Sequence, residues 1–141
     1  MNEIISERAV VEDVVFRLKE ILSENFCCEV PLLGRCVDLV FMKKKSLTSI
    51  EFKLTNWRRA IKQARDHRLG VDFAYVCMPE REVTEEMRFE FEQAGVGLFF
   101  YQKNGEWPFK VVVKAPQSKE VWSTARLKVL EYLQERNMGG F

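Results

Sequence analysis

The residues in this sequence that are best suited to chemistry are Asp38, Glu51 and Lys53, which occur in two consecutive segments. The segment 36–43 (CVDLVFMK) has the apolar character of a β-strand, and Asp38 interrupts it. In the segment 47–54 (LTSIEFKL), Glu51 and Lys53 alternate with apolar residues and therefore share the polar face of a second strand. Two carboxyl groups and an ammonium group gathered on one face could bind a cation and activate a water molecule.

The register of the hairpin formed by these two strands decides how close the three side chains come. A tight, lysine-rich connection joins the strands, and their apolar faces must match. The residues placed on the shared apolar face are Val37, Leu39, Phe41, Ile50, Phe52 and Leu54. Asp38 then lies opposite Glu51 if the loop has two residues, or opposite Lys53 if it has four. Opposed Cβ atoms are about 4.5–5.5 Å apart and diagonal ones about 7–8 Å, so both registers bring the three side chains together.

Two carboxylates at this distance repel each other, and one takes up a proton unless a cation lies between them. Oxygen ligands without histidine or thiolate favour Mg²⁺ or Mn²⁺ over zinc. His67 is the single histidine and the four cysteines have no C-x-x-C spacing, so we expect buried reduced thiols rather than a zinc site. Lys53 could orient a water nucleophile and stabilise negative charge on a phosphate. The alternative is a plain salt bridge between Lys53 and either acid.

The first predicted helix supplies a further acid. Residues 6–24 have helical apolar spacing, and Glu7 falls within the apolar stripe at 100° per residue, whereas Glu12 points away from it. An acid in line with this stripe, at the start of the helix, can reach the edge of a sheet. Stabilisation of the helix dipole by a first-turn glutamate is the alternative explanation.

The remaining segments predict an α/β protein with the element order αβββαβαββα. Pro31 places the strand 26–33 at a sheet edge or a bulge. A helix separates the strands 47–54 and 72–78, so these two should pair in parallel through a right-handed crossover. The other expected elements are a helix at 57–69 with Asn56 as its N-cap, a helix between Thr84 and Gly95, a hairpin of 96–103 and 108–115, and a helix at 118–136.

The order of these motifs resembles the PD-(D/E)XK nuclease superfamily. The motifs are a helix with an acid, Val37-Asp38, I-E-F-K at 50–53 and N-W-R-R-A-I-K-Q-A at 56–64. Val37 stands where the name of the superfamily has proline, which leaves the acid in place. The resemblance implies a restriction-endonuclease-like αβββαβ core with a mixed sheet at about residues 6–78. A C-terminal helix, hairpin and helix, at about 79–138, would extend this core.

The resemblance also assigns roles at the centre of the site. Asp38 and Glu51 would bind Mg²⁺ or Mn²⁺, and the backbone carbonyl of Phe52 between the glutamate and the lysine would be an extra ligand. Lys53 would hold or activate the attacking water.

Two further catalytic assignments follow from the same resemblance. Glu7 would be the helix-one acid, with Glu3 or Glu12 as alternatives because the helix is long. Gln63 matches a glutamine that many members carry on the following helix, although a polar helix flank explains it about as well.

Basic residues are concentrated in one part of the chain. The segment 35–69 has ten lysines and arginines against three acids, a net charge of +7, while the remainder carries −6. We expect this segment to bind the phosphate backbone of a nucleic acid, although a solvated helix face would look similar. The expected nucleic-acid-binding residues are Lys44, Arg58, Arg59, Lys62 and Arg65.

The helix at 57–69 has two polar flanks beside its apolar stripe. Arg58, Lys62 and Arg65 share one flank, and Arg59, Gln63 and His67 share the other. We interpret His67 as a surface or boundary residue in preference to a general base, and Trp57 as a core residue in preference to a stacking platform for a base.

Length and composition limit the classes of protein to which this chain could belong. A chain of 141 residues, 47% apolar and 30% charged, is typical of one globular domain, here 1–141. Its apolar runs are far shorter than the roughly 20 residues of a membrane-spanning helix. Acids occupy the N-terminal residues where a signal peptide would be basic, so we expect a cytoplasmic protein.

The sequence therefore predicts a divalent-metal-dependent nuclease that hydrolyses phosphodiester bonds of nucleic acid, with DNA as the expected substrate. One rival is a catalytically silent domain of the same fold that binds nucleic acid or a partner protein. Another is a structural α/β protein whose acids and lysines only pair on the surface. Cleavage of both strands of a duplex would need two sites, which a homodimer would supply.

Overall fold

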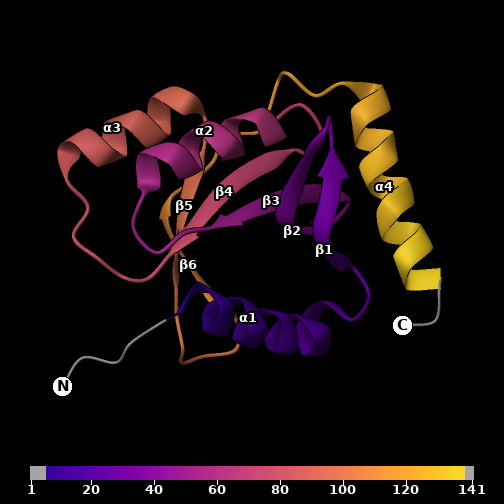
Figure 1. Ribbon diagram of the computed structural model, residues 1–141, viewed down its shortest axis with the longest axis horizontal. Coiled ribbons are helices and arrows are strands. Elements are labelled where there is room, and N and C mark those ends of the chain that lie inside the picture. The colour runs from indigo at the N-terminus through magenta and orange to yellow at the C-terminus, as the bar shows by residue number, and fades with distance from the viewer. Residues whose placement is uncertain (1–5, 139–141) are drawn as a thin grey trace.

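The computed structural model describes residues 6–138 and has a mixed α/β architecture (Figure 1). The helices and strands follow one another in the order predicted from the sequence. Within the described residues they are α1 (Glu7–Leu22), β1 (Phe26–Leu32), β2 (Arg35–Lys43), β3 (Ser46–Phe52), α2 (Trp57–His67), β4 (Phe73–Met78), α3 (Glu85–Ala94), β5 (Gly97–Tyr101), β6 (Phe109–Val113) and α4 (Ser123–Met138).

The six strands form one mixed sheet in the order β1-β2-β3-β4-β5-β6. β1, β2 and β3 are antiparallel neighbours, β3, β4 and β5 run parallel, and β6 returns antiparallel to β5. The parallel pairing of β3 with β4 and the place of Pro31 on an edge strand confirm two predictions from the sequence. Because β3, β4 and β5 are parallel, their carboxyl ends lie at the same edge of the sheet.

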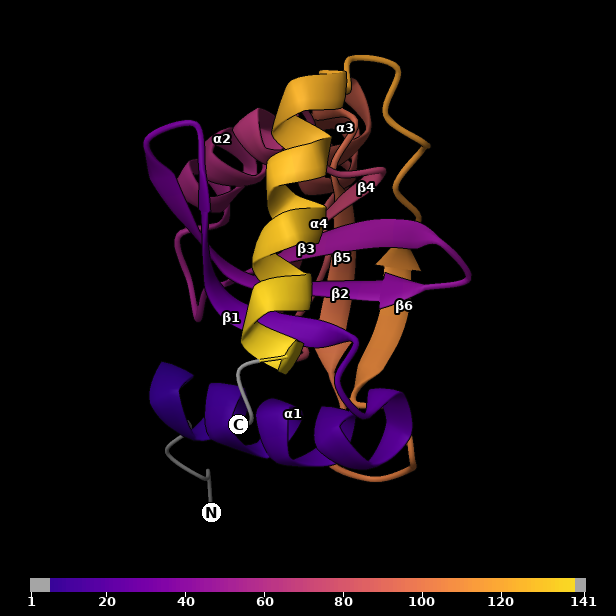
Figure 2. The same cartoon turned by 90° about the vertical axis from the view of Figure 1, so that its right-hand side faces the viewer.

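Helices cover both faces of the sheet, so that its central strands are buried on both sides (Figure 1). α1 packs Val10, Val14 and Leu18 onto one face, in a cluster that includes Leu39 and Ile50. The apolar residues of α2 and α3 occupy a second cluster on the opposite face. α4 lies against β1 at the edge of the sheet (Figure 2).

Side chains at the helix ends explain where the first three helices begin and stop. Ser6, Asn56 and Thr84 each accept a hydrogen bond from the backbone N–H three residues later, which satisfies a donor that the helix leaves unpaired. Gly95 ends α3 in the left-handed conformation, with φ of 69°. The predicted caps at Asn56, Thr84 and Gly95 are confirmed.

The predicted start of the last helix at Ser118 is wrong, because α4 begins at Ser123. Two hydrogen bonds made by Ser118 hold the preceding segment outside the helix. The Ser118 N–H donates to the Asp72 carbonyl at 2.7 Å, and the Ser118 hydroxyl donates to the Arg68 carbonyl at 2.8 Å. Ser118 therefore ties the chain to the corner between α2 and β4 before the helix starts.

The β2–β3 hairpin has the two-residue loop, which selects one of the two registers allowed by the sequence. Leu39 pairs with Ile50 and Lys43 pairs with Ser46, so Asp38 falls opposite Glu51. The two loop residues, 44 and 45, both have positive φ, at 51° and 68°. Because β3 ends at residue 52, Lys53 lies one residue beyond the strand in which it was predicted.

The prediction that Val37 shares the apolar face of Leu39 and Phe41 is wrong. Leu39 and Phe41 belong to the cluster beneath α1, whereas Val37 belongs to the cluster on the side of α2. The hairpin of β1 and β2 leaves the plane of the sheet and rises beside α2, and Glu29 within β1 has a positive φ of 51° (Figure 2). This bend turns Val37 to the other face while residues closer to the loop keep the predicted alternation.

Among residues 6–138 there is no helix that is both long enough and apolar enough to span a membrane.

Candidate active site

The centre of the candidate site is the pair of carboxyl groups on adjacent strands, Asp38 of β2 and Glu51 of β3. The register of the hairpin places the two residues opposite each other. Asp38 is half-buried, and its Oδ2 accepts a hydrogen bond of 2.9 Å from the Phe52 backbone N–H. Glu51 is 6% exposed, which is unusual for a glutamate. The structure therefore brings together the two acids that the sequence singled out.

Burial raises the pKa of both acids, and the charge of Asp38 adds to this effect at Glu51. Burial, together with the neighbouring charge of Asp38, raises the pKa of Glu51 to about 8, while the positive charge of Lys53 acts in the opposite direction. Burial also raises the pKa of Asp38, against the hydrogen bond from Phe52 and the charge of Lys53. Near neutral pH the metal-free pair therefore shares one proton.

Lys53 is the third predicted residue that the structure brings to this pair. Its backbone N–H donates to the Cys77 carbonyl at 3.0 Å, which fixes the residue beside β4. Its positive charge lowers the pKa of both Asp38 and Glu51. Within the described part of the chain, no ion pair joins Lys53 to either acid, so the plain salt bridge is not formed here.

Two residues of α2, Gln63 and His67, border the same site. They line a pocket of about 270 Å³ together with Glu51, Arg35 and Cys36. The His67 Nε2 atom lies 3.9 Å from Glu51 Oε1. Gln63, one of the predicted catalytic residues, thus lies beside the acid pair. Its Oε1 atom is buried and has no hydrogen-bond partner among the described residues.

His67 is the functional candidate that the sequence interpretation undervalued. It is 2% exposed rather than at the surface. Burial, with a smaller contribution from the charge of Arg35, lowers the pKa of its imidazole to about 4, and the charge of Asp66 opposes this shift. The available signal was its spacing four residues after Gln63, which places both side chains on one flank of α2. Sequence spacing gave no indication that the bent β1–β2 hairpin would lie beside the His67 end of this flank.

Of the three candidate helix-one acids, the two within the described residues, Glu7 and Glu12, are not brought to the pair. Glu7 is exposed at the start of α1, which covers the face of the sheet opposite to α2. Glu12 is also exposed and pairs with Arg8 at 2.9 Å. Glu3 lies outside the described residues.

The predicted nucleic-acid-binding residues are spread over three surfaces. Arg58 pairs with Glu86 at 2.6 Å and Glu90 at 3.2 Å, and it stacks over Trp57, so α3 neutralises its charge. Trp57 itself packs against Phe91, as expected for a core residue.

The other four basic residues are exposed, but only one lies on the flank of the candidate site. Arg59 shares the flank of Gln63. Lys62 and Arg65 line a groove between α2 and α3. Lys44 is in the β2–β3 loop, six residues along the strand from Asp38, or about 20 Å away.

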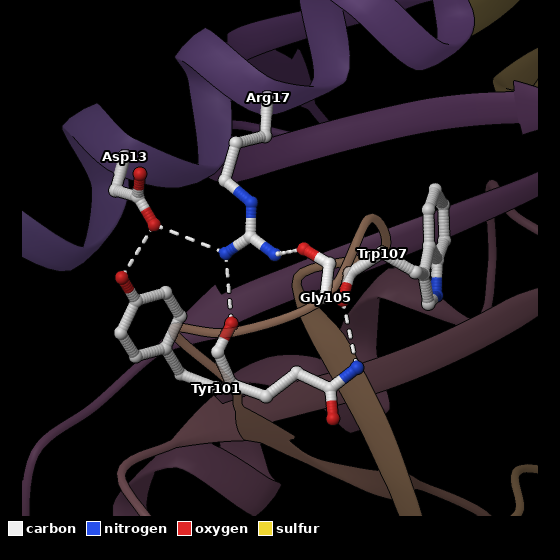
Figure 3. Close-up of polar contacts among 6 residues, drawn as sticks. Asp13, Arg17, Tyr101, Gly105 and Trp107 are labelled. Atoms are coloured by element: carbon white, nitrogen blue, oxygen red, sulfur yellow. Dashed lines mark hydrogen bonds and ion pairs between the residues drawn. The ribbon is translucent and has the colours of Figure 1, made fainter.

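A second polar cluster joins α1 to the β5–β6 loop (Figure 3). Asp13 accepts a hydrogen bond from the Tyr101 hydroxyl and pairs with Arg17 at 3.1 Å. Arg17 also donates to the carbonyl oxygens of Gln102 at 2.7 Å and Gly105 at 2.5 Å. These contacts use the charged groups internally, so the cluster fixes α1 against the sheet and is a structural feature.

The donor set around Asp38 and Glu51 fits a hard cation better than a zinc ion. Among residues 6–138, no group of three or more His, Cys, Asp or Glu side chains is placed to hold a metal. Mg²⁺ does not need such a cage, because it is commonly held by one or two carboxylates together with water and substrate phosphates. Two adjacent carboxyl groups that repel each other meet this requirement.

The sequence matches no protein-family description and no curated protein. The assignment of chemistry to this site therefore rests on its geometry.

We predict that the metal-free protein loses stability as the pH rises from about 6.5 to about 8. Since the pKa of Glu51 is raised by folding, the folded state binds this proton more tightly, and the resulting stabilisation is lost as the pH approaches 8. The lowered pKa of His67 has the opposite effect, but only below its ordinary value of 6.5. Chemical denaturation in EDTA should show a loss of about 1–2 kcal/mol between pH 6.5 and 8.

Glu51→Gln is the matched control for this measurement, because an amide of nearly the same shape cannot titrate. The free energy of unfolding of this variant should change little between pH 6.5 and 8. Two results would show that the pKa of Glu51 is not raised. One is a wild-type free energy of unfolding that is the same at pH 6.5 and pH 8, and the other is an equal decrease in Glu51→Gln.

Proposed function

We propose that this protein is a divalent-metal-dependent nuclease with a restriction-endonuclease-like fold, related to the PD-(D/E)XK superfamily, and that it hydrolyses phosphodiester bonds in DNA. The observation that carries the proposal is the pairing of Asp38 with Glu51 on adjacent strands, with Lys53 next to both. Such a pair is unfavourable in the metal-free protein, and a bound cation would relieve the repulsion.

Asp38 and Glu51 would hold Mg²⁺ or Mn²⁺, and the Phe52 carbonyl is a further candidate ligand. When bound, the cation would supply positive charge that activates water and neutralises charge on a phosphate. The hydrogen bond from the Phe52 N–H to Asp38 Oδ2 fixes the orientation of this carboxylate. The ammonium group of Lys53 would orient the attacking water and stabilise the negative charge that develops on the phosphate.

Nucleic acid would approach the site along the flank of α2 that carries Arg59. Arg35 also lines the pocket beside Glu51, and it pairs with Asp66 at 3.5 Å. The opposite flank is less suitable, because Glu86 and Glu90 of α3 neutralise Arg58. Exposed cations near the site, rather than the whole basic segment, would make the phosphate contacts.

Replacing any of the three central residues should abolish cleavage. We expect Asp38→Ala, Glu51→Ala and Lys53→Ala each to lower the rate by about 100-fold or more, because each removes a group that binds the cation or stabilises charge in the transition state. The assay uses Mg²⁺ or Mn²⁺ with linear, branched and single-stranded DNA and with RNA. Glu12→Ala, an exposed acid on α1, is the control and should cleave like the wild type.

Wild-type cleavage that persists in EDTA, or normal cleavage by Asp38→Ala, would refute this mechanism. A folded protein that binds DNA without cleaving any of these substrates would favour the silent-domain alternative. One observation favours the silent-domain alternative: Glu7 is exposed and makes no contact with the acid pair among the described residues.

The two flanks of α2 predict different salt dependences of DNA binding. Arg59→Ala should reduce the slope of log K against log salt by about one unit, because one phosphate contact is lost. Arg58→Ala is the matched control on the neighbouring residue and should leave the slope unchanged, since its charge is already paired. The reverse result would place the nucleic acid over the groove between α2 and α3.

A further inference from the structure

The buried imidazole next to Glu51 has no role in the mechanism described above. His67 is 2% exposed, its Nε2 atom faces Glu51 Oε1 at 3.9 Å, and its Nδ1 atom has no hydrogen-bond partner among the described residues. A buried polar side chain without a partner costs stability, so its presence beside a functional acid needs an explanation.

We infer that His67 is a positioning residue, which donates a hydrogen bond from Nε2 to the Glu51 carboxylate when that carboxylate holds the metal. This inference rests on the proposed function. The present separation exceeds a hydrogen bond by about 1 Å, so the donation requires the two groups to move closer by that amount when the metal binds. A carboxylate that binds a metal is commonly held by such an outer partner, and loss of the partner typically weakens metal affinity about 10–100-fold.

The fold holds His67 in a fixed place for this role. α2 presents it one turn after Gln63, and both side chains line the pocket beside Glu51. Ala60, Ile61 and Ala64 of α2 anchor the helix in the core, which fixes the backbone of His67 beside the acid. Gln63 Oε1, which also lacks a partner among the described residues, offers a second polar atom at the same wall.

The geometry favours positioning over direct ligation. No three metal-binding side chains converge within residues 6–138, and Asp38 already provides the second carboxylate next to Glu51. A histidine ligand would also shift preference away from Mg²⁺ towards metals that favour imidazole. The two roles therefore differ in measurable metal selectivity.

The test compares His67→Leu, which fills the space without a donor, with His67→Gln, which keeps an N–H donor. Calorimetric titration with Mg²⁺ and with Mn²⁺ should show that the leucine variant binds both metals about 10-fold more weakly. The glutamine variant should stay within about threefold of the wild type. Circular dichroism and melting temperature establish that each variant is folded.

A second measurement does not depend on either variant folding. His67 is the single histidine of the chain, so ¹⁵N-histidine labelling gives imidazole signals that need no assignment. On addition of Mg²⁺ to the wild type, the proton on Nε2 should remain bound and move downfield as it hydrogen bonds to Glu51. No Mg²⁺ response of this proton would overturn the inference.

Three outcomes of the titration would also overturn it. Wild-type affinity in His67→Leu would show that no donor is needed, and weak binding in both variants would show that a donor does not suffice. A loss confined to Mn²⁺, with release of the Nε2 proton, would make His67 a ligand instead. A wild type that binds neither metal would refute the proposed function and this inference with it, whereas the other results refute the inference alone.

Discussion

The contact between the carboxyl groups of Asp38 and Glu51 is the interaction on which the rest of this site depends. Two acids on opposed strand positions cannot both be ionised at low cost when one of them is almost fully buried. A proton or a cation must neutralise the pair. In the metal-free protein a proton neutralises the pair, which is why the pKa of Glu51 is raised. In the proposed enzyme a divalent cation would take the place of that proton and would also serve the chemistry.

The fold enforces this contact from several directions. The two-residue loop of the β2–β3 hairpin fixes the register that sets Asp38 opposite Glu51. α1 and α2 bury the opposite faces of the same strands, so a slip by one residue would exchange the side chains packed beneath the two helices and disrupt both clusters. The hydrogen bond from the Phe52 N–H then holds Asp38 in place, and the sheet therefore stabilises an arrangement that electrostatic repulsion opposes.

Much of this architecture could be predicted from the sequence because local patterns determine it. Caps at Asn56 and Thr84 and the glycine at 95 act within a few residues, and each was confirmed. The convergence of Asp38 with Glu51 was also predictable, since face matching left only two registers. The choice between those registers depended on whether the loop residues adopt positive φ, which lysine does not signal.

The predictions that proved wrong share a different cause, which is contact between segments that are distant in sequence. Ser118 leaves the predicted helix because it bonds to the corner between α2 and β4. Val37 changes face, and His67 becomes buried, where the bent β1–β2 hairpin lies beside α2. Apolar spacing placed Glu7 in line with the core, but spacing alone does not tell which face of the sheet the helix will cover.

Calorimetric unfolding of wild type and Asp38→Asn, at a pH of about 8.5 where Glu51 has lost its proton, tests the metal-site assignment most directly. Asparagine can still accept the hydrogen bond from Phe52, so the substitution removes the charge and little else. In EDTA the variant should melt at a higher temperature than the wild type. Mn²⁺ or Mg²⁺ at a hundred times the dissociation constant should stabilise only the wild type, by about 2.7 kcal/mol. The account would be contradicted if Asp38→Asn melted at a lower temperature than the wild type and neither metal changed the melting temperature of the wild type.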